Sequence, residues 1–141
     1  MKLAIAYNKE ITNIVKTMGK ALRDEGFDVD LFEIKEAEKT DTFHSGLFSS
    51  SKLIIIGLGQ TSRSGGIPME FEEFINNSPF IGGKQIAVFV TKKVNRASTS
   101  LKHLMKIVEE NGGFLFDFEI IGNEESAEKF ALRLSSIRDT I

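Results

Sequence analysis

A run of apolar, largely β-branched residues from Lys52 to Leu58 constrains the fold of this chain more than any other segment. It predicts a strand that is covered on both faces, as in the middle of a parallel sheet. A polar loop with Gly59, Gly65 and Gly66 follows at once, and Pro68 then precedes hydrophobic residues at helical spacing. Because ligands bind beyond the carboxyl ends of the strands in open parallel sheets, this glycine-rich loop is the first candidate for a site.

The composition excludes several classes of protein and of site. The 141 residues, 41% of them hydrophobic, match one domain with a real core, and we expect residues 1–141 to form it. A chain without cysteine has no disulfide, thiolate metal site or cysteine nucleophile. Its net charge of −2 gives no general basic field for nucleic acid. Since no apolar run suits a signal peptide or a membrane span, we expect a cytoplasmic protein that binds neither nucleic acid nor membrane.

Four other segments have the patterns of strands. Residues 3–7 and 85–91 are mostly apolar, which predicts two more central strands. In residues 27–34 and 114–121 apolar and acidic residues alternate, which predicts strands with one wet face at the edges of the sheet. The side chains expected to share the apolar face of the last strand are those of Phe114, Phe116, Phe118 and Ile120. We interpret these phenylalanines mainly as core residues, and pairing of the exposed edge with a partner is the alternative.

Helical patterns separate the strands. Apolar residues from Ile11 to Leu22 fall on one helical face. Ser98 is expected to cap the helix that ends before Gly112, and Asn123 to cap the last helix. Strands that alternate with helices require a parallel sheet with right-handed crossovers. Because the second and fifth strands have a wet face and belong at the edges, the expected strand order is 2-1-3-4-5.

The loop after the central strand resembles the second flavin loop of flavodoxins and of the FMN reductases related to them. That loop has roughly the pattern glycine, small residue, proline, threonine, two aromatics, two glycines, isoleucine, proline. The residues that match it in register are Gly59, Gly65, Gly66, Ile67 and Pro68. The order of elements resembles that family over essentially the whole chain. The resemblance implies a flavodoxin-like three-layer α/β/α sandwich with FMN as the cofactor.

All three loops that would contact the flavin depart from the family pattern. In the first, Thr12 matches the last threonine of a flavodoxin phosphate loop, but Glu10 stands where a glycine lets backbone N–H groups close around the phosphate. In the second, Arg63 and Ser64 replace the two aromatics. The third loop, residues 92–97, lacks both glycine and an aromatic residue. Ring stacking would therefore have to come from phenylalanine or from a guanidinium plane.

Basic residues gather in these loops instead. They are Lys9, Arg63, Lys92, Lys93 and Arg96. Clustered cations in a concave site attract negatively charged ligands, so the three loops predict an anion pocket, with Arg63 as the first candidate for a ligand contact. Any one of these side chains can also be simply solvated.

Other chemistries find little support. The segment Gly57-Leu-Gly59 lacks the third glycine of a dinucleotide fingerprint, and no helix opens directly after it. Response regulators share the strand order but need acidic residues where Tyr7-Asn8 and Gly57-Leu58 stand. His44 and His103 are isolated, so no metal site is predicted, and no catalytic residue either.

Two hypotheses for the function remain. The first, which we prefer, is an FMN-binding electron carrier with a redox protein as a possible partner; the flavin would carry the redox step. The second is a flavin-free binding or regulatory module for another phosphate-bearing small molecule or for an acidic protein partner. The residues expected at the cofactor are Asn8, Lys9, Thr12, Asn13, Gly59, Gln60, Thr61, Ser62, Arg63, Gly65, Gly66, Thr91, Lys92, Lys93, Asn95 and Arg96.

Overall fold

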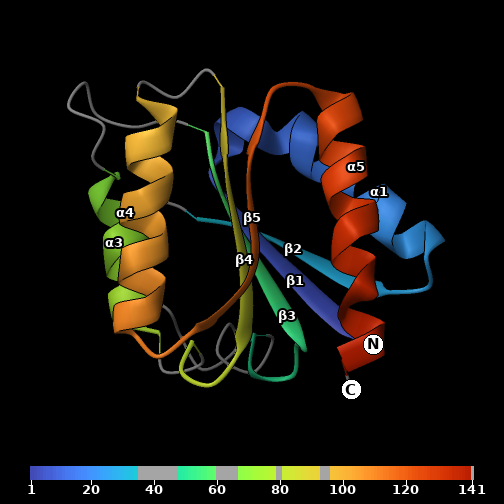
Figure 1. Cartoon of the computed structure of the whole chain (residues 1–141), viewed down its shortest axis with the longest axis horizontal. Coiled ribbons are helices and arrows are strands. Elements are labelled where there is room, and N and C mark those ends of the chain that lie inside the picture. The colour runs from blue at the N-terminus through green and yellow to red at the C-terminus, as the bar shows by residue number, and fades with distance from the viewer. Residues whose placement is uncertain (35–47, 60–66, 79–80, 93–95, 141) are drawn as a thin grey trace.

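A computed structural model describes residues 1–34, 48–59, 67–78, 81–92 and 96–140 of the chain. Its centre is a five-stranded parallel sheet with the order β2-β1-β3-β4-β5 (Figure 1). The strands are β1 (Lys2–Tyr7), β2 (Asp28–Glu33), β3 (Leu53–Leu58), β4 (Gln85–Thr91) and β5 (Phe114–Ile121). The predicted fold class and strand order are confirmed.

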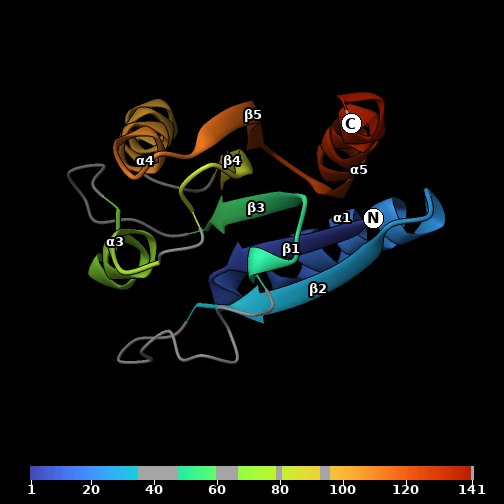
Figure 2. The ribbon, with the colours of Figure 1, turned by 90° about the horizontal axis from the view of Figure 1, so that it is seen from below.

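The helices cover both faces of the sheet. Those described are η1 (Lys9–Ile11), α1 (Thr12–Asp24), α3 (Met69–Asn76), α4 (Ala97–Glu110), α5 (Glu124–Leu134) and η2 (Ser135–Thr140), where η denotes a 3-10 helix. Figure 2 shows α1 and α5 on one face and α3 and α4 on the other, which gives the molecule three layers. No helix in the described ranges is long and apolar enough to cross a membrane.

Each face of the sheet has its own hydrophobic core, and β3 contributes to both. Ile54 and Ile56 pack in the α3–α4 core, whereas Leu53 and Ile55 pack in the α1–α5 core. All four side chains are fully buried. Burial of one such side chain stabilises the fold by about 1.5–3 kcal/mol. The central position of this strand, predicted from its unbroken apolar run, follows from that double coverage.

The glycine inside β3 makes room for an aromatic ring on the neighbouring strand. A Cβ atom at Gly57 would lie 2.2 Å from Cζ of Phe89 in β4. Phe89 is fully buried and packs edge-on against Phe130 of α5, with 6.1 Å between the ring centroids. Gly57 therefore has a packing role in the core of the sheet.

Strand β5 contains one extra residue relative to its neighbour. Ile86 of β4 pairs with Leu115, but the next residue, Ala87, pairs with Asp117. Phe116 is thus left between two paired positions, as in a β-bulge. A bulge changes which face of the sheet the following side chains occupy.

This bulge contradicts the predicted apolar face of the last strand. Phe116 packs against the α1–α5 core, whereas Leu115 and Ile120 pack against the α3–α4 core. Phe114 and Phe118 are 61% and 50% exposed. The prediction that Phe114, Phe116, Phe118 and Ile120 share one face in the core is wrong, because alternation in a sequence does not show a bulge.

The N-termini of α4 and α5 are capped in different ways. In α4, Ser100 N–H donates to the Arg96 carbonyl at 3.0 Å, so the helix starts at Ala97 and Arg96 occupies the N-cap with φ 53°. The predicted cap at Ser98 is wrong, because Ser98 already lies within the first turn and has helical backbone geometry. At α5, the predicted cap is confirmed.

The N-cap of α5 is a reciprocal pair of side chains. Asn123 Oδ1 accepts the Ser126 N–H at 2.8 Å, and Ser126 Oγ accepts the Asn123 N–H at 3.1 Å. Such a capping box satisfies two backbone donors that a helix start otherwise leaves open. It fixes the start of α5 at the carboxyl edge of the sheet.

Candidate functional site

A cavity of about 410 Å³ opens at the carboxyl edge of the sheet, between the starts of α1 and α5. Its described wall consists of Glu10, Ile11, Asn13, Ile14, Gly59, Thr91, Lys92, Gly122, Asn123 and Glu124. These residues follow β1, β3, β4 and β5, or end them, which places the cavity where an open sheet of this order binds ligands.

Asn8 joins the first two loops of the site. Its side chain is buried, and Oδ1 accepts the Gly59 N–H at 2.7 Å. Gly59 itself has no space for a side chain, since a Cβ atom there would lie 2.3 Å from Cγ2 of Ile11. One hydrogen bond and one close contact therefore hold the end of β3 against the turn after β1.

The turn after β1 closes on itself. Ile11 N–H donates to the Asn8 carbonyl at 3.1 Å, and Thr12 N–H donates to the Lys9 carbonyl. The Thr12 hydroxyl donates to the same Lys9 carbonyl at 2.7 Å. Phosphate loops need backbone N–H groups that point to the ligand. These two N–H groups are already bonded within the turn and are therefore not free for an anion.

The described wall of the cavity carries more negative than positive groups. Glu10 contributes a carboxylate from η1, Glu124 contributes one from the start of α5, and Lys92 contributes an ammonium from the end of β4. The Lys92 side chain lies over Gly122, where an added Cβ would come within 2.9 Å of Lys92 Cδ. Gly122 thus leaves space for the lysine at the cavity wall.

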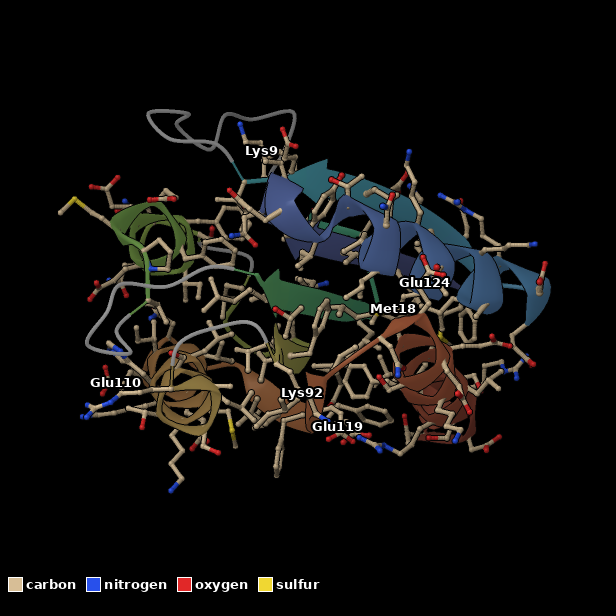
Figure 3. The ribbon with its side chains drawn as sticks, turned by 90° about the horizontal axis from the view of Figure 1, so that it is seen from above. Lys9, Met18, Lys92, Glu110, Glu119 and Glu124 are labelled. Atoms are coloured by element: carbon tan, nitrogen blue, oxygen red, sulfur yellow. The ribbon has the colours of Figure 1, made fainter. Side chains whose placement is uncertain are left out.

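The predicted cations do not all lie at this wall. Lys9 is exposed beside the ends of β1 and β2, whereas Lys92 lies beside β5 (Figure 3). Arg96 is exposed at the start of α4. Arg63 and Lys93 fall outside the described residues. The convergence of these side chains on one ligand therefore stays a prediction.

Apart from Lys9 and Arg96, the predicted site residues either line the cavity, support the turn beside it, or lie outside the described residues. Asn13, Gly59, Thr91 and Lys92 line the cavity, and Asn8 and Thr12 support the turn beside it. Those that lie outside the described residues, with Arg63 and Lys93, are Gln60, Thr61, Ser62, Gly65, Gly66 and Asn95.

The loop between β5 and α5 was missed as part of the site. Gly122, Asn123 and Glu124 line the cavity from that side. The sequence carried a signal for this loop, because the carboxyl ends of parallel strands meet at one edge of a sheet. A capping asparagine directly after the last strand is therefore a wall residue as well as a cap.

Aromatic side chains are absent from the described part of the cavity wall. Tyr7, the last residue of β1, is 8% exposed and packs in the α1–α5 core. Burial, and secondarily the charge of Glu33, raise the pKa of Tyr7 above its ordinary value, so the phenol stays neutral at physiological pH. Among the described residues no group of three or more His, Asp or Glu side chains is placed to hold a metal ion.

Comparisons with known proteins concern the fold. No protein-family model and no curated protein sequence matches the chain. A flavodoxin from Streptococcus pneumoniae TIGR4 aligns over 100% of both chains with a TM-score of 0.75 and 14% identity. Flavodoxin 2 from Bacillus cereus aligns over 100% of both chains with a TM-score of 0.67 and 19% identity.

General stress protein 14 from Treponema denticola, solved in complex with FMN, also resembles the chain. The alignment covers 98% of this chain and 94% of that one, with a TM-score of 0.56 and 12% identity. Three layers, a parallel sheet of order β2-β1-β3-β4-β5 and likeness to these structures over nearly the whole chain establish one conclusion. By fold, this protein is flavodoxin-like.

Proposed function

We propose that this protein binds flavin mononucleotide at the carboxyl edge of its sheet and transfers electrons through it. The observation that carries the proposal is the fold, which is similar to flavodoxins over the whole chain. The 410 Å³ cavity at the expected edge supports it. The flavin would supply the redox chemistry, so no side chain has to act as an acid, base or nucleophile.

The chain would hold the cofactor mainly through side chains and a fixed pair of loops. Asn13 on α1 and Lys92, which directly follows β4, both line the cavity, and both can donate to a phosphate. Lys9 adds a positive charge at the same end of α1. Asn8 and Gly59 would keep the two loops at a constant separation. These donors can bind a phosphate, and the carboxylates of Glu10 and Glu124 are the opposing charges on the cavity wall.

A second candidate is a flavin-free module for another phosphate-bearing small molecule or an acidic protein. The observation that favours it is the turn after β1, where the N–H groups of Ile11 and Thr12 are already bonded within the turn. Glu10 on the cavity wall adds a charge that a phosphate dianion would oppose.

Titration of the purified protein with FMN tests the proposal. We expect quenching of flavin fluorescence, a shifted flavin absorbance band and reversible reduction of the bound flavin. Riboflavin, which lacks the phosphate, is the control for the side chains around α1 and should bind more weakly. A protein that ignores FMN but is thermally stabilised by another nucleotide or by inorganic phosphate would support the flavin-free module instead.

Removing the Glu10 charge should strengthen FMN binding. Glu10→Gln keeps the shape of the side chain but removes a carboxylate from the cavity wall. We expect the dissociation constant to fall by about threefold to tenfold at low salt, and by less at high salt. Fluorescence titration at two ionic strengths measures this.

The matched control is Glu125→Gln, on the exposed first turn of α5. It makes the same change in net charge, but Glu125 pairs with Lys129 and does not line the cavity. Its affinity for FMN should equal that of the wild type. Equal affinities for the two variants would show that the phosphate does not bind near Glu10.

A further inference from the structure

The outer edge of β5 has backbone groups that face away from the sheet. Lys92 N–H donates to the Ile121 carbonyl at 2.9 Å, so Ile121 faces the inner neighbour, β4. Successive residues of a parallel strand bond to opposite sides, and Phe118 and Ile120 therefore face outward. Outward N–H and C=O groups of an edge strand are ordinarily open to pairing with another strand.

These two outward N–H groups are bonded by carboxylates of the same strand. Phe118 N–H donates to Asp117 Oδ1 at 2.8 Å, and Ile120 N–H donates to Glu119 Oε1 at 3.1 Å. In each case the acceptor belongs to the preceding residue. Two of the donors that an incoming strand needs, the N–H groups of Phe118 and Ile120, are thus already satisfied.

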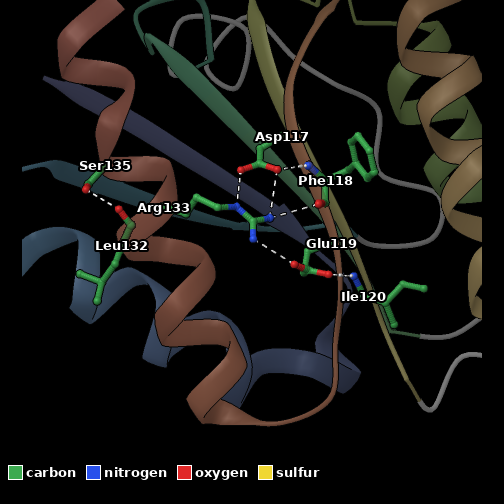
Figure 4. A network of polar contacts seen from close by, with 7 residues as sticks. All are labelled: Asp117, Phe118, Glu119, Ile120, Leu132, Arg133 and Ser135. Carbon is green, nitrogen blue, oxygen red and sulfur yellow. Dashed lines mark hydrogen bonds and ion pairs between the residues drawn. The ribbon is translucent and has the colours of Figure 1, made fainter.

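Arg133 of α5 holds both carboxylates in this position (Figure 4). Its Nε donates to Asp117 Oδ2 at 2.6 Å, its Nη2 to Asp117 Oδ1 at 3.0 Å and its Nη1 to Glu119 Oε2 at 3.0 Å. Nη2 also donates to the Phe118 carbonyl at 3.2 Å, which occupies the outward acceptor. The guanidinium carbon lies 5.1 Å from the centroid of the Phe130 ring. Paired bonds of this kind are geometrically specific.

We propose that Asp117, Glu119 and Arg133, hereafter the edge cluster, prevent the β5 strand of a second copy of this chain from pairing with β5. The proposal is independent of the ligand. It identifies an interaction surface that stays closed while the edge cluster is intact.

A second copy is the occupant that the strand itself favours. Phe114 and Phe118 are 61% and 50% exposed, and both lie on the strand that such a pairing would join. The strand is rich in phenylalanine and isoleucine, which favour β-structure. Two identical edges can pair about a two-fold axis because each presents the same groups to the other. Within each copy, the positive charge of Arg133 offsets part of the negative charge of Asp117 and Glu119.

Opening the edge cluster tests the proposal. The double variant Asp117→Thr, Glu119→Thr removes both acceptors and leaves residues that suit a strand. We expect the dissociation constant for self-association to fall at least about tenfold relative to the wild type, measured by light scattering and sedimentation over a concentration series. In the dilute monomer, the N–H groups of residues 118 and 120 should exchange hydrogen faster than in the wild type.

Two further variants make the result specific. Glu125→Thr, Glu128→Thr changes the net charge equally, but on the exposed side of α5, and should associate like the wild type. Adding Phe118→Pro to the variant Asp117→Thr, Glu119→Thr removes the outward N–H of residue 118 without affecting the bonds to β4. This triple variant should have the wild-type dissociation constant for self-association. The proposal is overturned if the variant Asp117→Thr, Glu119→Thr folds but associates no more than Glu125→Thr, Glu128→Thr. It is also overturned if Phe118→Pro does not reduce the association of that variant.

Arg133→Gln provides a separate test if the double variant does not fold. It removes the paired bonds but leaves both carboxylates in the strand. We expect faster hydrogen exchange at residues 118 and 120, while the exchange of amides in β3 stays unchanged. Unchanged exchange at residues 118 and 120 in folded protein would show that Arg133 does not hold the edge.

Discussion

Replacing Gly57 with alanine is expected to lower the free energy of unfolding by about 3 kcal/mol. The added methyl group would lie 2.2 Å from Cζ of Phe89, and both residues belong to central strands. Phe89 could move away only by displacing its core neighbours, because its ring is fully buried and packs against Phe130. Urea denaturation followed by circular dichroism measures the loss.

The same substitution elsewhere should have the opposite sign. At Gly19 of α1 an added Cβ would meet its nearest neighbour, Leu31 Cδ2, at 3.5 Å, which is ordinary van der Waals contact. Because glycine weakens a helix interior, Gly19→Ala should stabilise the protein by about 0.5–1 kcal/mol. Two losses of equal size would show that the response is general to glycine replacement and not specific to the Phe89 ring.

A second-site change should rescue the Gly57 variant. Phe89→Leu vacates the space that the new methyl group needs, although it also reduces apolar burial. The double variant Gly57→Ala, Phe89→Leu should therefore lose less stability than the sum of the two single losses, by about 1 kcal/mol or more. Additive losses would mean that the methyl group does not contact the ring.

Replacing Asn8 with alanine is expected to weaken both the fold and ligand binding. The substitution leaves the Gly59 N–H without the acceptor that it has at 2.7 Å. The loss of a hydrogen bond at this part-buried donor costs about 0.5–1.5 kcal/mol in stability. The first two loops would also lose their hydrogen bond, so we expect FMN affinity to fall about tenfold. Denaturation and fluorescence titration of the same sample separate the two effects.

Asn13→Ala is the matched control for this variant. Asn13 is exposed and lines the cavity, so its loss should reduce FMN affinity and leave the unfolding transition within about 0.5 kcal/mol of the wild type. If Asn8→Ala changed affinity without changing stability, the hydrogen bond to Gly59 would not be the cause. If both variants kept wild-type affinity, the cavity would not be the FMN site.

Local patterns predicted the strands because the order of apolar and polar residues within a strand shows which of its faces are buried. Leu53–Leu58 is apolar on both faces, and both faces are covered. Asp28–Glu33 alternates, and it lies at an edge. The prediction failed at β5, where one extra residue at Phe116 moves later side chains to the other face. A bulge is a property of the pairing with β4, so β5 alone does not show it.

Hydrophobic periodicity encodes which faces are buried, so the amino-acid sequence was enough to predict the fold class, the strand order and the sheet edge at which the cavity opens. The side chains present at that edge are known only from the folded arrangement of the chain. It brings Glu10 and Glu124 to one cavity, joins Asn8 to Gly59 and sets Arg133 against the outer edge of β5. These contacts connect residues that are distant in the chain, and no local pattern records which distant side chain will complete a hydrogen bond.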